Sequence, residues 1–442
     1  MKRTALLSLL LLSTLLSIGQ SIEFNIEYKD ITITKTFSST YQLKFVKGGV
    51  YKVSVMQQGV DVILTLTDSN NKKILDQDSP NGANGPEKFD YVPETSGTYS
   101  LSIKRLEEDG NPDTGKVTVL VKSLNKQEIA LYEKNKKELA IENSKTVQTL
   151  DLDHFWEAFD NLKKCATHAD SVASFDNLYL DRATDGLKDF IGARGFTSEK
   201  FVTTVAKFPK FYASVRSNTY ECKKAAPLID DIFEKFKGIY TNFKPFKVCF
   251  AIGIVNTGGT VSSNFVLIGS EVSTSTVNTD LSEFNNSAFS NVLAGDKDIV
   301  QKIKNIVAHE CVHTQQKSRQ DSLSVKCPLL YAVMKEGFCD FIGELVAGDQ
   351  INKVAQAYGD KHEKQLWTEL KNELCNTSIN NWLYNYNTVK DKPADLGYYM
   401  GYKIAQEYYK NATDKKQAVI DIIEMTDPIK FLQLSKYDLK KL

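Results

Sequence analysis

The stretch that decides the fold of most of the chain is residues 299–317, IVQKIKNIVAHECVHTQQK. Apolar residues recur in it every three or four positions, which predicts a helix with an apolar face. The helix carries His309, Glu310 and His313, an H-E-x-x-H pattern. Because residues four apart lie one turn above each other, the two imidazoles can bind one metal ion, and Glu310 can take a proton from water beside it. The alternative is a helix with two surface histidines, which the apolar flank opposes.

A third protein ligand is expected from residues 328–349, PLLYAVMKEGFCDFIGELVAGD. A catalytic zinc site uses three protein ligands and keeps one position open for water. We expect Glu336 to be the third ligand and Asp340, one helical turn later, to accept the N–H of a ligand histidine. Glu344 is the rival ligand, but only Glu336 has an acid one turn after it. A solvated acidic helix face is the other alternative, although most of this segment is apolar.

These two segments together resemble a known arrangement. His309-Glu310-x-x-His313 followed by Glu336-Gly337-x-x-Asp340 is similar to the gluzincin pattern of thermolysin-like and aminopeptidase-like metallopeptidases. The chain more closely resembles an uncharacterised family of predicted zinc-dependent proteases that is loosely related to a gliding-motility lipoprotein. That resemblance covers roughly residues 150–437 and is carried by the stretches VCFAIGIVNTGGTVSSNFVLIGSE, AHECVHTQQ, LLYAVMKEGFCDFIGELVAG and LGYYMGYKIAQEYYK.

The resemblance implies a mainly helical α+β, zincin-like metallopeptidase domain with a small sheet, one Zn²⁺ ion and a peptide or protein substrate. The family usually has a small residue such as Ala at the position of Cys339. A thiol can bind zinc, but this one neighbours Asp340 rather than Glu336 along the helix, so we do not expect it to be a ligand.

A β-rich stretch interrupts the helices. In gluzincins, an exposed strand beside the zinc helix binds extended peptide through main-chain hydrogen bonds. Residues 248–253 (VCFAIG) and 265–271 (FVLIGSE) are the candidates here, and a turn at Gly258 and Gly259 would allow close approach. An ordinary core hairpin is an equally good interpretation.

A donor for the oxyanion of a tetrahedral intermediate is also required. Tyr398 and Tyr402 lie one turn apart in a predicted helix, as do Gly397 and Gly401, whose bare faces permit close helix packing. A tyrosine is a neutral donor near pH 7. Tyr398 is the first candidate and Tyr402 the second, while filling of an aromatic core is the alternative for both.

The N-terminal part of the chain has the pattern of β-strands rather than of helices. Residues 22–123 contain short segments that alternate apolar and polar residues, separated by turns rich in Gly, Asn, Asp and Pro, which predicts an antiparallel β-sandwich. The stretches YKVSVMQQGVDVILTLTDSNNKK and DSPNGANGPEKFDYVPETSGTYSLSI resemble a pre-peptidase-type domain, which implies an accessory role. The turn DSPNG, residues 78–82, offers oxygens for calcium, although a bare turn is the more ordinary interpretation.

A charged helical linker is expected over residues 124–148, followed by the metallopeptidase domain over 149–442.

Residues 1–19 have the features of a secretory signal peptide, with Lys2 and Arg3 before an apolar run and small residues after it. An uncleaved anchor is the alternative, but the run is short for a bilayer span, and no later stretch is long and apolar enough to cross a membrane. A secreted or extracytoplasmic location is therefore expected. The seven cysteines do not reveal which of them pair.

The chain has 442 residues with equal numbers of acidic and basic side chains, so a nucleic-acid partner is not expected. Together these features predict a secreted zinc metallopeptidase that hydrolyses peptide bonds with water activated by Glu310. Two alternatives are a zinc hydrolase of a non-peptide amide or ester, and a catalytically inactive zinc-containing binding protein. The oligomeric state is not predictable.

Overall fold

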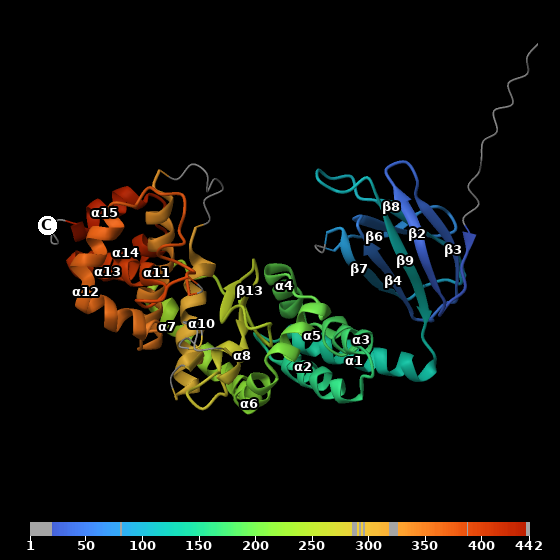
Figure 1. Cartoon of the computed structure of the whole chain (residues 1–442), viewed down its shortest axis with the longest axis horizontal. Coiled ribbons are helices and arrows are strands. Elements are labelled where there is room, and N and C mark those ends of the chain that lie inside the picture. Colours follow the sequence, from blue (N-terminus) through green and yellow to red (C-terminus); the bar gives the residue numbers. More distant parts are fainter. Residues whose placement is uncertain are drawn as a thin grey trace, which may run out of the picture. The chain divides into compact units, whose positions relative to one another are not determined.

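The computed structural model describes residues 20–79, 82–284, 290, 293–294, 297–317, 326–386 and 388–438. The predicted signal peptide, residues 1–19, lies outside them. The chain forms two compact units, residues 1–136 and 137–442, that divide within helix α1 (Lys126–Ser144), in the predicted linker (Figure 1). Within the described ranges, no helix combines the length and the apolar character needed to cross a membrane.

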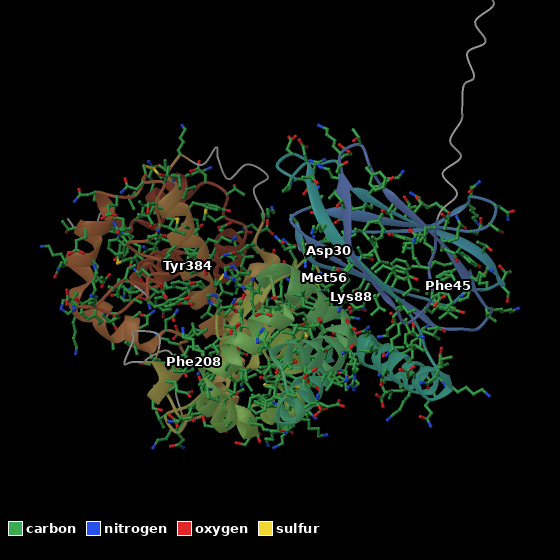
Figure 2. All side chains as sticks on the ribbon, turned by 45° about the vertical axis from the view of Figure 1, so that its right-hand side comes forward. Asp30, Phe45, Met56, Lys88, Phe208 and Tyr384 are labelled. Atoms are coloured by element: carbon green, nitrogen blue, oxygen red, sulfur yellow. A yellow bond between two sulfur atoms is a disulfide. The ribbon has the colours of Figure 1, made fainter. Side chains whose placement is uncertain are left out.

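The N-terminal unit is a β-sandwich, which confirms the predicted fold class. Its first sheet has the order β1 (Gln20–Ser21), β3 (Ser39–Phe45), β8 (Gly97–Arg105), β5 (Val62–Thr67), β6 (Lys73–Gln77). The second has the order β2 (Glu27–Thr34), β9 (Thr114–Ser123), β4 (Tyr51–Gln58), β7 (Asn84–Tyr91). All pairings are antiparallel except that of the short β1 with β3. Buried residues alternate along the strands, and side chains such as Phe45 fill the space between the sheets (Figure 2).

The C-terminal unit is mainly helical, as predicted, and encloses one small mixed sheet. The sheet has the order β10 (Val147–Gln148), β11 (Lys247–Ala251), β13 (Phe265–Gly269), β12 (Gly259–Val261). Its first three strands are parallel, and β12 runs antiparallel to β13 at the edge. The helices are α2 (Leu150–Asn161), α3 (His168–Leu178), α4 (Asp185–Arg194), α5 (Ser198–Lys207), α6 (Pro209–Thr219), α7 (Ala226–Ile239), α8 (Ser270–Ser273), α10 (Ile299–Gln315), α11 (Pro328–Ala347), α12 (Lys353–Lys371), α13 (Leu396–Asn411), α14 (Lys415–Ile423) and α15 (Pro428–Ser435).

Glycines bring the three helices around the candidate site into backbone contact. A Cβ at Gly401 of α13 would clash with the carbonyl of Val333 in α11, and a Cβ at Gly337 of α11 would clash with the backbone of α13. A Cβ at Gly343 would lie 3.2 Å from the backbone nitrogen of His309, so α10 also packs tightly on α11. Because backbones this close leave little room for sliding, the side chains of α10 and α11 are held in a fixed register.

One disulfide joins Cys327, at the start of α11, to Cys375, which follows α12. Backbone hydrogen bonds from Leu329 to Asn376 and from Leu330 to Leu374 accompany it. The other five cysteines are free. The first turn of α11 is thus tied covalently to the loop that follows α12.

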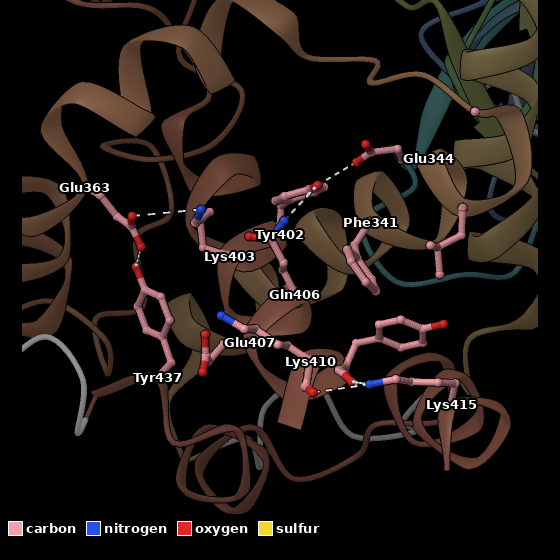
Figure 3. A pocket seen from close by; sticks show the side chains of 13 residues that line it. Phe341, Glu344, Glu363, Tyr402, Lys403, Gln406, Glu407, Lys410, Lys415 and Tyr437 are labelled. Atoms are coloured by element: carbon pink, nitrogen blue, oxygen red, sulfur yellow. Dashed lines mark hydrogen bonds and ion pairs between the residues drawn. The ribbon is translucent and has the colours of Figure 1, made fainter. Parts of the chain in front are cut away.

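A pocket of about 1080 Å³ opens over α11 and α13. Figure 3 shows its charged and aromatic lining, in which the hydroxyl of Tyr402 donates a hydrogen bond to Oε2 of Glu344 at 2.5 Å. His309, His313 and Glu336 are not among its lining residues. This pocket is therefore distinct from the site described below.

Candidate functional site

Helix α10 presents the H-E-x-x-H residues to the interior of the C-terminal unit. The helix begins after Asp298, whose side chain accepts a hydrogen bond from the backbone N–H of Gln301 at 3.0 Å. His309 and Glu310 are only 5% and 8% exposed, and His313 is half-buried. The centroids of the two imidazole rings lie 5.0 Å apart. The helix therefore holds both imidazoles on one face, close enough to share an ion.

Glu336 of α11 meets both imidazoles with a single carboxylate oxygen. Its Oε2 lies 3.2 Å from Nε2 of His313 and 3.7 Å from Nε2 of His309. Zinc–ligand bonds of about 2.0–2.2 Å separate two ligand atoms of a tetrahedron by roughly 3.3–3.6 Å. Both distances from Glu336 are thus close to the ligand–ligand spacing that one zinc ion requires. Two imidazole nitrogens and one carboxylate oxygen are also the donor set of a catalytic zinc site, so these residues fit the ion.

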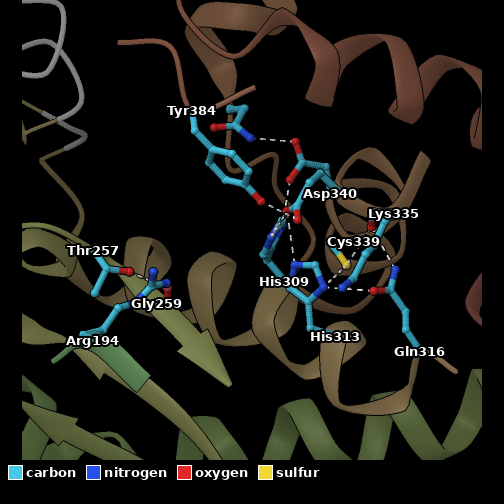
Figure 4. A network of polar contacts seen from close by, with 12 residues as sticks. Arg194, Thr257, Gly259, His309, His313, Gln316, Lys335, Cys339, Asp340 and Tyr384 are labelled. Atoms are coloured by element: carbon cyan, nitrogen blue, oxygen red, sulfur yellow. Dashed lines mark hydrogen bonds and ion pairs between the residues drawn. The ribbon is translucent and has the colours of Figure 1, made fainter. Parts of the chain in front are cut away.

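The other nitrogen of each imidazole is held by an oxygen. Nδ1 of His309 lies 2.8 Å from Oδ1 of Asp340, whose Oδ2 accepts a hydrogen bond from Asn352 at 2.7 Å. Nδ1 of His313 lies 2.9 Å from Oε1 of Gln316 (Figure 4). Because these oxygens accept hydrogen bonds, they place the proton of each neutral imidazole on Nδ1, which leaves the lone pair of Nε2 for a metal. Asp340 and Gln316 therefore select the tautomers that ligation needs.

Without an ion, the charges of the cluster favour a second proton on His309, which zinc would displace on binding. Burial acts to lower the pKa of His309, but the hydrogen bonds to Asp340 and Glu336 outweigh it and raise this pKa well above its usual range. Burial acts to raise the pKa of Glu336, but His313 and His309 hold it well below its usual range. Glu336 is therefore an anion, as a metal ligand must be.

Glu310 lies against the edge strand of the small sheet. A Cβ at Gly259 would lie 2.6 Å from Oε1 of Glu310, and a Cβ at Gly258 would lie 2.8 Å from Cδ1 of Ile306. The two glycines therefore let β12 run directly along α10. Burial raises the pKa of Glu310, with the two histidines opposing it, which shifts this carboxylate toward the range of a general base.

The edge strand is not one of the two segments proposed from the sequence. Residues 248–253 and 265–271 contain β11 and β13, which pair on both sides and are almost entirely buried. Neither segment can therefore add a further strand. The edge is β12, whose three residues are half-buried. Thr260 shares its ladder hydrogen bonds with β13, so the backbone groups of Gly259 and Val261 face outward.

Arg194, the last residue of α4, also reaches this edge. Its Nη2 donates to the carbonyl of Gly259 at 3.3 Å (Figure 4). Its Nε is buried without a hydrogen-bond partner among the described residues. Against the larger effect of burial, its charge acts to lower the pKa of Glu310. The guanidinium thus binds the edge strand and lies near enough to the expected base for its charge to act on it.

A buried carboxylate positions the loop that leads into β12. Glu271 accepts hydrogen bonds from the backbone N–H groups of Gly253 at 2.8 Å and of Val255 at 3.0 Å. Val255 has φ 58°, a left-handed conformation that costs a β-branched residue energy. The hydrogen bond from its N–H holds it there, which indicates that the loop path is imposed by the surrounding structure.

Cys339 offers a different third donor. One donor atom each from His309, His313 and Cys339 lie within 4.8 Å of one another. However, the sulfur lies 3.3 Å from Nδ1 of His313, the nitrogen on the side away from Glu336. Burial also raises the pKa of this thiol well above its usual range, whereas zinc binds the thiolate. Glu336 is therefore the better third donor.

Tyr384 is a site residue that the sequence did not reveal. Its hydroxyl donates to Oε1 of Glu336 at 2.7 Å, although the residue as a whole is 54% exposed. Its φ is 55°, which is strained for a bulky residue. A reciprocal pair of hydrogen bonds between Asn385 and Asp395, of 3.2 and 2.8 Å, closes the loop that holds it.

The two tyrosines proposed from the sequence lie in different places. The ring of Tyr398 stacks on His309 with centroids 6.1 Å apart, so this residue borders the cluster. The hydroxyl of Tyr402 instead donates to Glu344, in the separate pocket. The structure therefore does not bring Tyr402 to the expected base. Glu344, the rival ligand, binds Tyr402 in that pocket, whose lining does not include the two histidines.

Three residues at the site escaped the sequence-based reasoning, namely Arg194, Gln316 and Tyr384. Gln316 lies three residues after His313, so its spacing was a usable signal. Arg194 precedes a glycine at a helix end and reads as an ordinary C-terminal cation. Tyr384 stands in an irregular segment with no periodicity, and no local pattern marks it.

Comparison with known proteins gives structural likenesses and one family match. None of the curated proteins is similar enough to count as a match. The pre-peptidase C-terminal domain of a collagenase from Bacillus anthracis is similar at 18% identity and a TM-score of 0.20, covering 24% of this chain and 94% of that one. PliG from Aeromonas hydrophila, a periplasmic inhibitor of g-type lysozyme, is similar at 12% identity and a TM-score of 0.19, with the same coverage. Residues 281–426, which contain α10, α11 and α13, match the family model described as Predicted Zn-dependent protease (DUF2268), and this confirms the predicted family for that part of the chain.

Proposed function

We propose that the C-terminal unit is a zinc metallopeptidase that hydrolyses peptide bonds. The observation that carries the proposal is the convergence of Nε2 of His309, Nε2 of His313 and Oε2 of Glu336 at 3.2 and 3.7 Å, beside the buried Glu310. A structural zinc site commonly uses four protein ligands, often cysteines, and has no use for a buried base. The family match supports a zinc-dependent protease in general terms.

The residues divide the chemistry among them. His309, His313 and Glu336 would hold the ion, which when bound supplies Lewis-acid activation of water and of the scissile carbonyl. Glu310 accepts the proton of the attacking water and passes it to the leaving amine. Asp340 and Gln316 keep the imidazoles oriented while this happens.

Strand β12 is the proposed docking edge for an extended peptide. Its outward-facing backbone groups run past Glu310, so a peptide added antiparallel or parallel to it would pass the base. Arg194 already donates to the carbonyl of Gly259, so we propose that it fixes this edge and offers a further donor to a substrate carbonyl. Main-chain recognition of this kind favours peptides over small esters.

Tyr384 is the preferred donor to the oxyanion. Its hydroxyl already touches the ligand Glu336, whereas Tyr398 contributes a ring face against His309. Burial raises the pKa of Tyr384 far above its usual value, with the charge of Glu336 adding to the effect. The phenol therefore keeps its proton at neutral pH and can donate to developing negative charge.

We also propose an extracytoplasmic location for the protein. The Cys327–Cys375 disulfide supports it, because such bonds persist mainly in oxidising compartments. Fractionation of producing cells tests it, and recovery of the protein only from the cytoplasm, with both thiols reduced, would contradict it.

Metal analysis combined with peptide cleavage tests the enzymatic proposal. The purified protein should contain one zinc per chain and cleave members of an unstructured peptide library, and a chelator should abolish cleavage until zinc is restored. Glu310→Gln should keep the zinc and lose at least about 10²-fold in kcat. Cleavage of esters or non-peptide amides alone would favour the broader hydrolase alternative, and zinc without any hydrolysis would favour an inactive binding protein.

A further inference from the structure

Three acidic side chains meet inside the N-terminal sandwich, in the unit that contributes nothing to the zinc chemistry. Asp61 immediately precedes β5, Asp78 follows β6, and Glu87 lies within β7. One carboxylate oxygen from each lies within 4.8 Å of the other two. Since β5 and β6 belong to one sheet and β7 to the other, the three carboxylates join the two layers.

Two of these acids are buried and incompletely paired. Asp61 is 4% exposed and Glu87 is 0% exposed. Oδ1 of Asp61 and Oε2 of Glu87 are buried and have no hydrogen-bond partner within the described part of the chain. The other oxygen of Glu87 accepts a hydrogen bond from Gln57 at 3.3 Å. A buried carboxylate oxygen without a partner is costly, so each of these two atoms calls for a ligand.

Asn111 fixes the backbone beside the first of these acids. It binds the backbone of Asp61 through two hydrogen bonds of 2.9 Å, one to its N–H and one to its carbonyl. Neither contact uses the carboxylate of Asp61, an oxygen of which lies within 4.8 Å of one from Glu87.

We propose that Asp61, Asp78 and Glu87 form a binding site for a calcium-class divalent cation, one that ties the two sheets of the sandwich together. All three donors are hard carboxylate oxygens, which suit Ca²⁺, whereas zinc prefers sites that include nitrogen or sulfur. Asp78 is exposed, so water can complete the six to eight ligands that Ca²⁺ takes. Asp78 of the turn DSPNG belongs to the site, and Pro80 and Asn81 of that turn lie outside the described residues.

Calcium titration of the full chain tests this site. Protein freed of divalent ions and reloaded with one equivalent of zinc is heated in 0 to about 10 mM CaCl₂ while strand unfolding is followed by circular dichroism. The wild-type Tm for the sandwich should rise by several degrees, and calorimetric titration should show one Ca²⁺ per chain. MgCl₂ should give a smaller rise, and an equal or larger one would overturn the assignment to the calcium class.

Two variants separate the site from general stabilisation by salt. Asp78→Asn and Glu87→Gln should lose the calcium-dependent rise, while Asp109→Asn, which changes an exposed acid of the same unit, should keep it. Because Asp78 is exposed, its variant should fold, and without calcium its Tm should be no lower than that of the wild type. No rise in the wild type, or an equal rise in Asp78→Asn and Asp109→Asn, would overturn the proposal.

Discussion

Gly259 of the edge strand lies directly against the carboxylate of Glu310, so that a Cβ at this position would come within 2.6 Å of Oε1. The contact joins the strand proposed to bind substrate to the residue proposed to activate water. Because no Cβ fits between them, a shift of the strand toward α10 would displace the carboxylate. The position of the base is therefore set by the sheet as well as by its own helix.

Gly259→Ala should displace Glu310 and lower kcat/KM at least about tenfold, since small displacements of a catalytic group cost about this much or more. Zinc content should not change, because the atoms nearest to a Cβ at Gly259 all belong to Glu310 and not to a ligand. Gly192→Ala is the matched control, since this exposed glycine of α4 has nothing within 4 Å of its added Cβ. Full activity of Gly259→Ala in a peptide-cleavage assay would show that Glu310 does not depend on this contact.

Glu336→Gln should lower zinc affinity by more than about 100-fold. Loss of a residue that only hydrogen-bonds a ligand costs about 10- to 100-fold, and this change removes a charged ligand itself. Glu344→Gln, the control at the rival position, should retain one zinc per chain, since Glu344 binds Tyr402 in the separate pocket. Competition with a chromogenic zinc chelator measures both affinities. Equal losses in the two variants, or a loss only in Glu344→Gln, would reverse the assignment of the third ligand.

Tyr384→Phe should lower kcat by a factor on the order of 10², as expected for loss of one oxyanion donor, with a smaller effect on KM. Tyr402→Phe should leave kcat unchanged and cost about 1 kcal/mol of stability through its lost hydrogen bond. Steady-state kinetics on one peptide substrate compares the two variants. A large loss of kcat in Tyr402→Phe alone would make Tyr402 the oxyanion donor and remove Tyr384 from the mechanism.

The helical part of the site could be predicted from the sequence because its residues have a regular spacing. His309 and His313, and likewise Glu336 and Asp340, are four residues apart, and this spacing alone places each pair on one helix face. Close packing was also predicted from Gly397 and Gly401, and Gly401 does lie against Val333 of α11, whereas Gly397 lies against Trp382 and Leu383. What the sequence could not supply was the meeting of distant segments, such as Arg194 with Gly259 across 65 residues.

The choice of strand shows where apolar pattern misleads. Residues 248–253 and 265–271 are strongly apolar, and continuous apolar runs are typical of strands buried on both faces, which fits the core-hairpin alternative. A docking edge needs exposed backbone, and β12 has only three half-buried residues with little apolar signal. The prediction that Tyr402 lies near the base also rested on pattern alone. Helical spacing puts it one turn from Tyr398, but the side chain follows its own partner, Glu344.

Asp151, buried at the start of α2, should make the C-terminal unit less stable as the pH rises. Burial raises its pKa to about 7, despite hydrogen bonds from Thr184, whereas the unfolded chain has a value near 4. Between these values the folded state keeps a proton that the unfolded state has lost, so the free energy of unfolding falls with rising pH, by up to about 4 kcal/mol. Asp151→Asn cannot ionise and should flatten this slope in urea unfolding at pH 5 and 7.5, while the exposed Asp185→Asn should not. Equal slopes in the wild type and Asp151→Asn would mean that Asp151 is charged in the folded protein.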